Sequence, residues 1–141
     1  QRLLPVICPN CAVPWTKYDP RLPTIINQAI PPWCPDMTLV RRIGTGCEHC
    51  YGTGISGRTC VAEVIETDAE LMTDFARYGE NVARHRYRSR PDADPSLLET
   101  AMQLVAEGKL DPFDVNTIVE RIRDKEKVLE ERRNGAVREK Q

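Results

Sequence analysis

The second half of the chain has apolar residues at the spacing of amphipathic helices. From residue 67 onward they recur three or four positions apart, which places them on one helical face. These positions are Leu71, Met72 and Phe75; Leu97, Leu98, Ala101, Leu104 and Val105; and Val115, Ile118, Val119, Ile122 and Leu129. Stripes of this kind usually pack into a core, so we assign no ligand to them.

Residues typical of helix ends frame these stripes. Thr67 and Glu70 have the spacing of a capping box, which predicts a helix N-terminus with Thr67 as the cap. Asp94-Pro95 and Asp111-Pro112 each combine a capping Asp with a Pro suited to the first helical position. Gly108 predicts the end of the helix between them, because glycine favours the position just after a helix.

The first half is richer in Pro and Gly and has shorter apolar runs. Residues 38–43 and 58–65 are predicted as strands, joined through residues 44–57, and residues 23–30 as a short helix. Strands in one half and helices in the other predict an α+β fold.

A change in composition near residue 67 predicts two modules. Residues 1–66 hold all six cysteines, whereas residues 67–133 hold none and are predicted as a helical C-terminal domain. Residues 134–141 lack an apolar face, which predicts a charged, disordered tail. Just before it, Glu120 with Arg123 and Asp124 with Lys127 have the spacing of i,i+3 ion pairs.

Composition narrows the class of protein. The chain has 141 residues, a net charge of −1, 40% apolar and 6% aromatic residues, and 11 prolines. This length suits one domain or two small ones with a modest core, so an additional cross-link is expected. No apolar run approaches the roughly 18 residues of a membrane span. The balanced charge argues against a general nucleic-acid binder. Because the chain begins with Gln1 and lacks a signal segment, we expect a piece of a longer protein.

Four of the six cysteines form two Cys-x-x-Cys pairs. These are Cys8-Pro9-Asn10-Cys11 and Cys47-Glu48-His49-Cys50, which we call the first and the second knuckle. Each tight turn can aim two sulfurs at one point, and two such turns complete a tetrahedron, so we predict a structural Zn²⁺ held by Cys8, Cys11, Cys47 and Cys50. A disulfide framework and a redox pair are the alternatives, but disulfides within Cys-x-x-Cys are reactive and make poor frameworks.

The residues around the knuckles fit this interpretation. Pro9 stiffens the first turn, and Gly52 and Gly54 allow positive φ, which should bring backbone N–H groups toward the sulfurs. Cys34 and Cys60 have no Cys-x-x-Cys partner and are left out of the ligand set. Cys60 lies in a predicted strand, where we expect a buried structural thiol.

The combined motifs resemble a known family. The sequence runs Gln1-Arg2-Leu3, Cys8-x-x-Cys11, then Gly46-Cys47-x-x-Cys50-x-Gly52-Thr53-Gly54-x-x-Gly57-Arg58-Thr59 and Glu63-Val64. This pattern is similar to the tetracysteine region of the traffic ATPases of type II secretion and type IV pilus assembly. Residues 98–115 resemble the last helix-turn-helix of the same family. Pro5, Cys60 and Ala62 depart from its usual residues and suggest a divergent branch.

The resemblance implies a structural setting and partners. In that family the four cysteines hold zinc, the segment follows a P-loop ATPase core, and a helical domain comes next. It implies a cytoplasmic protein, peripheral at the inner-membrane face, whose partners are the other subunits of a homo-hexamer and an inner-membrane platform protein. ATP and Mg²⁺ would belong to the parent protein. No specific nucleic acid is expected as a partner.

The chain itself carries no recognisable catalytic constellation. It has no Gly-x-x-x-x-Gly-Lys-Ser/Thr sequence, so we predict no nucleotide hydrolysis by this chain alone. His49 and His85 have no evident nucleophile or carboxylate partner, and we name no catalytic residue. The predicted role is structural, through contacts with partners.

Two stand-alone zinc modules remain as alternatives. Residues 47–54 also fit the Cys-x-x-Cys-x-Gly-x-Gly repeat of J-domain co-chaperones, although only one copy is present. Residues 84–90 hold four arginines at alternate positions, which could bind phosphates in a nucleic-acid-binding zinc ribbon. The competing interpretation is a solvated segment, ion-paired near Glu80, Asp92 and Asp94.

Overall fold

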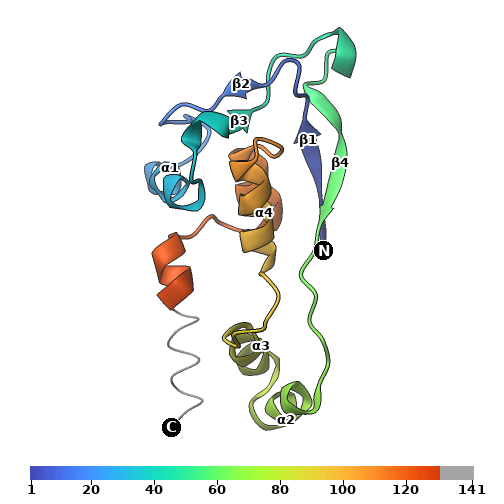
Figure 1. Cartoon of the computed structure of the whole chain (residues 1–141), viewed down its shortest axis with the longest axis vertical. Coiled ribbons are helices and arrows are strands. Elements are labelled where there is room, and N and C mark those ends of the chain that lie inside the picture. The colour runs from blue at the N-terminus through green and yellow to red at the C-terminus, as the bar shows by residue number, and fades with distance from the viewer. Residues whose placement is uncertain (131–141) are drawn as a thin grey trace.

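The computed structural model describes residues 1–130 and combines two small antiparallel sheets with helices (Figure 1). The strands are β1 (Arg2–Ile7), β2 (Val13–Pro14), β3 (Arg41–Arg42) and β4 (Ile55–Val61). β1 pairs with β4, and β2 pairs with β3. The longer ribbon runs from Arg2 opposite Val61 to Ile7 opposite Ile55, with an irregularity next to Ile7. The prediction of an α+β fold is confirmed.

Helices fill the space beside this ribbon. They are α1 (Thr24–Ala29), α2 (Ala69–Tyr78), α3 (Glu80–Arg88), α4 (Leu97–Ala106) and α5 (Pro112–Asp114). Short 3₁₀ turns are η1 (Pro31–Trp33), η2 (Met37–Leu39) and η3 (Glu48–Cys50), while the π-helical η4 (Val115–Val119) continues α5. Residues 125–130 form a further helical segment. None of the described helices is long and apolar enough to cross a membrane.

α4 lies at the centre of the main hydrophobic core, between the β1–β4 ribbon and α1 (Figure 1). The core draws on both halves of the sequence; its most buried side chains are Leu4, Ile30, Val40, Val61, Leu98, Met102, Val105, Leu110, Val115 and Ile122. A separate small cluster, Leu71 with Ala83 and Tyr87, joins α2 to α3. The proposed module boundary at residue 66 stays a prediction, and the predicted tail at 134–141 lies outside the described residues.

The two predicted strands are shifted or shortened. Of residues 38–43 only Arg41–Arg42 is a strand, because the Asp36 carboxylate accepts a hydrogen bond from the Thr38 N–H (3.0 Å) and caps the 3₁₀ turn η2 instead. The predicted strand 58–65 is in fact β4 (Ile55–Val61), since the ladder ends at the pair of Arg2 with Val61. The short helix predicted within residues 23–30 is confirmed as α1.

Two predicted helix caps are wrong by one or two residues. Asp68, not Thr67, caps α2 by accepting from the Leu71 N–H at 2.8 Å. α4 begins after Ser96 rather than Asp94, because Ser96 and Glu99 form a reciprocal capping box that satisfies two N–H groups. The predicted stop at Gly108, with φ of 78°, and the predicted cap Asp111 are both confirmed.

The last predicted helix, over 111–129, is interrupted. After η4 the chain leaves the helical path at Glu120, and the Asn116 side chain accepts a hydrogen bond from the Ile122 N–H (2.9 Å). Asp124 then accepts from the Lys127 N–H at the start of 125–130, so it caps a helix instead of pairing with the Lys127 ammonium. The Arg123 Nε and a Glu120 carboxylate oxygen lie 3.8 Å apart, so this ion pair forms as the spacing predicts.

Candidate metal centre

The two knuckles meet beyond the end of the β1–β4 ribbon. β1 leads directly into Cys8, and the second knuckle leads through Gly54 into β4, so the paired strands carry both turns to the same place. The Cys8 N–H donates to the Gly54 carbonyl (2.9 Å), which joins the knuckles through the backbone. The four sulfur atoms, of Cys8, Cys11, Cys47 and Cys50, all lie within 4.8 Å of one another.

Two glycines permit this close approach. A Cβ atom added at Gly44 would lie 1.9 Å from the Cys11 carbonyl oxygen, so no other residue fits there without a backbone shift. Gly54 has φ of 75°, as predicted, and a Cβ on it would press against the backbone of Gly44 and the side chain of Ile43. The need for Gly44 is a tertiary effect that the local pattern does not reveal.

Hydrogen bonds are directed at two of the sulfurs. The backbone N–H groups of Cys47 and Gly54 donate to the Cys50 sulfur at 3.2 and 3.1 Å, which confirms the predicted approach of N–H groups. The Asn10 side-chain amide donates to the Cys47 sulfur at 3.3 Å.

These bonds favour the thiolate form in the second knuckle. The Asn10 amide is the main reason why the pKa of Cys47 is lowered. Burial opposes ionisation of Cys50, but the backbone donors of Cys47 and Gly54, together with the side chains of Cys47 and Cys11, outweigh it and lower the pKa of Cys50 to about 6. In the first knuckle, burial raises the pKa of Cys11 to about 12. Metals bind the thiolate, so the sulfurs of Cys47 and Cys50 are better prepared for binding than that of Cys11.

The geometry fits a tetrahedral thiolate site for zinc. With zinc–sulfur bonds of about 2.3 Å, the sulfurs of a regular tetrahedron are about 3.8 Å apart. The measured separations are 3.8 Å for Cys8–Cys47, 3.8 Å for Cys11–Cys50 and 3.7 Å for Cys47–Cys50. A disulfide would require about 2.05 Å, so the sulfurs are spaced for holding a metal ion and not for a bridge.

Most of the sequence matches the model of a known family. A family model described as "Type II/IV secretion system protein" matches residues 1–130. The chain belongs to this family. No individual curated protein matches the sequence. Membership in the type II/IV secretion family confirms the resemblance predicted from the knuckles and the Gly-x-x-Gly-Arg-Thr motif.

The remaining cysteines of this secretion-family chain lie outside the cluster. Cys34 is buried in the main core after η1. Cys60 is exposed on β4, so the prediction of a buried thiol there is wrong. The reason is the strand alternation: the neighbouring Val61 faces the core, which turns Cys60 outward.

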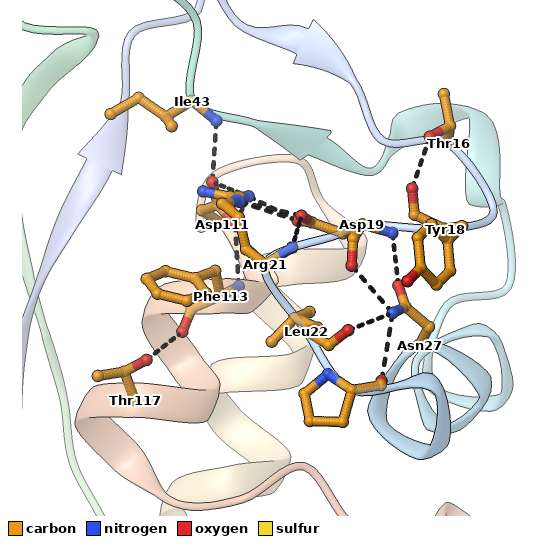
Figure 2. A network of polar contacts seen from close by, with 11 residues as sticks. Thr16, Tyr18, Asp19, Arg21, Leu22, Asn27, Ile43, Asp111, Phe113 and Thr117 are labelled. Atoms are coloured by element: carbon orange, nitrogen blue, oxygen red, sulfur yellow. Dashed lines mark hydrogen bonds and ion pairs between the residues drawn. The ribbon is translucent and has the colours of Figure 1, made fainter.

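A polar network that the sequence analysis missed joins the segments next to β2 and β3 to α1 and to the start of α5 (Figure 2). The Arg21 guanidinium bridges the buried carboxylates of Asp19 (2.6 Å) and Asp111 (2.9 Å). Asp111 also accepts from the N–H groups of Ile43 and Phe113, both at 2.9 Å. The cap role of Asp111 was visible in the sequence, but its pairing with a residue 90 positions away was not.

The arginine-rich segment 84–90 of this secretion-family chain is ion-paired, and its residues 84–88 lie in the second half of α3. Its four arginines pair as Arg84–Glu80, Arg86–Asp74, Arg88–Glu63 and Arg90–Asp68. Asp74 lies on α2, Asp68 caps it and Glu63 follows β4, so of the predicted partners only Glu80 is correct. The tertiary fold brings the other acids to the arginines.

Proposed function

We propose that this chain is the non-catalytic, zinc-binding and helical module of a traffic ATPase that drives type II secretion or type IV pilus assembly. Membership in the type II/IV secretion family supports the assignment to such an ATPase. Residues 1–141 contain no phosphate-binding loop, which supports a structural role for this part of the ATPase. In the proposed setting the module is cytoplasmic, lies at the inner-membrane face, and contacts other subunits of a homo-hexamer and the platform protein.

The observation that carries the proposal is the tetrahedral arrangement of four thiols. Cys8, Cys11, Cys47 and Cys50 would supply thiolates to one Zn²⁺, which would act as a structural cross-link. The cross-link would join segments separated by residues 12–46, a long segment whose helices, turns and strands are all short. Zinc contributes on the order of 10 kcal/mol to the folding of small modules, which is enough to make such a segment stiff.

Metal analysis of purified protein tests the ligand set. We expect one zinc per chain in the wild type, in Cys34→Ser and in Cys60→Ser, because neither of those thiols reaches the cluster. Cys47→Ser should lose the metal, since a hydroxyl is a poor replacement for a thiolate. Zinc-free wild type that is folded and reduced would contradict the site, and metal loss in Cys34→Ser would contradict the quartet.

The contact role is tested in the parent ATPase. A rigid module joined to a moving core can transmit displacement to a partner, whereas a flexible one cannot. We therefore expect the double variant Cys8→Ser, Cys11→Ser to abolish pilus assembly or secretion while nucleotide binding stays near the wild-type level. Normal assembly or secretion by this variant would contradict the contact role and would show that the metal centre only helps the chain to fold locally.

A further inference from the structure

We propose that Asn10 is a positioning residue of the metal centre, which fixes the Cys47 sulfur from the opposite knuckle and thereby slows the release of metal. The inference rests on the zinc site proposed above. Its basis is the hydrogen bond from the Asn10 side-chain amide to the Cys47 sulfur (3.3 Å), which joins residues 37 positions apart.

The two sulfurs of the second knuckle are supported in different ways. Cys50 receives N–H donors from Cys47 and Gly54, both within or next to its own turn. These backbone hydrogen bonds form whenever the second knuckle folds, with or without the first knuckle beside it. The Asn10 amide, in contrast, reaches Cys47 only when the two knuckles face each other. The hydrogen bond from Asn10 therefore holds the Cys47 sulfur in place only when the four sulfurs have come together.

A zinc ion bound by four thiolates carries a net charge of minus two, which donors around the sulfurs offset. Hydrogen bonds to ligand atoms commonly tune metal affinity by 10- to 100-fold. Asn10 is exposed, so we expect an effect at the lower end of that range. Exposure also means that its replacement creates no cavity in the core.

The second knuckle supplies a matched control. His49 occupies the position in Cys47–Cys50 that Asn10 occupies in Cys8–Cys11, and it too is exposed. Among the described residues, no hydrogen bond joins the His49 side chain to a ligand sulfur. If the inference is correct, truncation at residue 10 matters and truncation at residue 49 does not.

The test measures zinc binding and release by the full chain, with a chromophoric chelator as the competitor. Asn10→Ala should bind zinc about tenfold more weakly and release it faster. Asn10→Asp, which replaces the donor by a carboxylate facing the thiolate, should impair binding as well. His49→Ala should stay within about twofold of the wild type.

Cobalt substitution supplies a readout that a general loss of stability does not move. A hydrogen bond lowers the energy of the sulfur lone pairs, so Asn10→Ala should shift the thiolate-to-Co²⁺ charge-transfer band to longer wavelength. Equal zinc release and equal spectra in the wild type, Asn10→Ala and His49→Ala would overturn the role of Asn10 while leaving the zinc site intact. A wild type that binds no zinc would overturn both.

Discussion

At the scale of single residues, Asp111 and Asp114 show how position changes the role of one side-chain type. Asp111 is almost fully buried, but its carboxylate accepts from Arg21 and from two backbone N–H groups, so its charge is compensated. Asp114 lies one helical turn further on and is half-buried. Burial, and then the negative charge of Asp111, raise the pKa of Asp114 to about 6.

The raised pKa makes Asp114 a residue that destabilises the fold near neutral pH. In the unfolded chain an Asp ionises near pH 3.9, so between about pH 4 and 6 the folded state holds the extra proton and stability falls as the pH rises. We expect Asp114→Asn to raise the free energy of unfolding at pH 7 by about 1 kcal/mol, discounted for partial exposure, with a smaller gain near pH 4.

Denaturant unfolding of the wild type and of Asp114→Asn, near pH 4 and at pH 7, measures this difference in the free energy of unfolding. Because the two proteins are compared at the same pH, the contribution of the metal site cancels. A pH-independent difference between Asp114→Asn and the wild type would contradict the raised pKa.

At the scale of elements, the α2–α3 hairpin depends on polar contacts more than on its core. Its apolar cluster has three buried members, and Met72 and Phe75 of α2 stay about half exposed. Ion pairs compensate: Arg86 reaches Asp74 on α2, and Arg90 reaches Asp68 at its cap. The hairpin should therefore be the described part that opens most readily.

The cap of α2 gives a direct test. Asp68→Ala removes both the bond to the Leu71 N–H and the ion pair with Arg90, and it should destabilise the helix by at least about 1 kcal/mol. Thr67→Ala is the matched control and should change stability by less than about 0.5 kcal/mol, because Thr67 is not the cap. Hydrogen exchange of the α2 amides measures the difference. Equal acceleration in both variants would contradict the assignment of the cap.

At the scale of the whole molecule, the metal centre and the α2–α3 hairpin lie at opposite ends of the long axis, with α4 between them (Figure 1). Several contacts tie the strand region to the α4–α5 connection. The Ile7 N–H donates to the Lys109 carbonyl (3.0 Å), and Asp111 accepts from the Ile43 N–H and pairs with Arg21 (Figure 2). The ribbon, α4 and the network thus form a continuous packed body. Such a body suits the proposed transmission of motion from a core to a partner.

The sequence by itself determined the features that depend on local chemistry. The spacing of Cys8-x-x-Cys11 and Cys47-x-x-Cys50 identified the four thiols that meet, because two intervening residues are what such a turn requires. Helical periodicity identified the apolar face of α4, and Asp111-Pro112 and Gly108 identified two helix ends. The motif pattern around the second knuckle also carried the family resemblance, which the match over residues 1–130 confirmed.

Only the tertiary structure decided the features that depend on distant partners. The caps of α2 and α4 are not of this kind: Asp68 and Ser96 each accept from an N–H three residues further on, and Ser96-x-x-Glu99 has the capping-box spacing, so the predictions of Thr67 and Asp94 failed on local grounds. The Asn10–Cys47 bond and the Arg21–Asp111 pair join residues 37 and 90 positions apart. The spacing of residues along the chain does not reveal such pairs. A contact between distant residues forms only when many weak packing interactions have fixed the path of the chain between them.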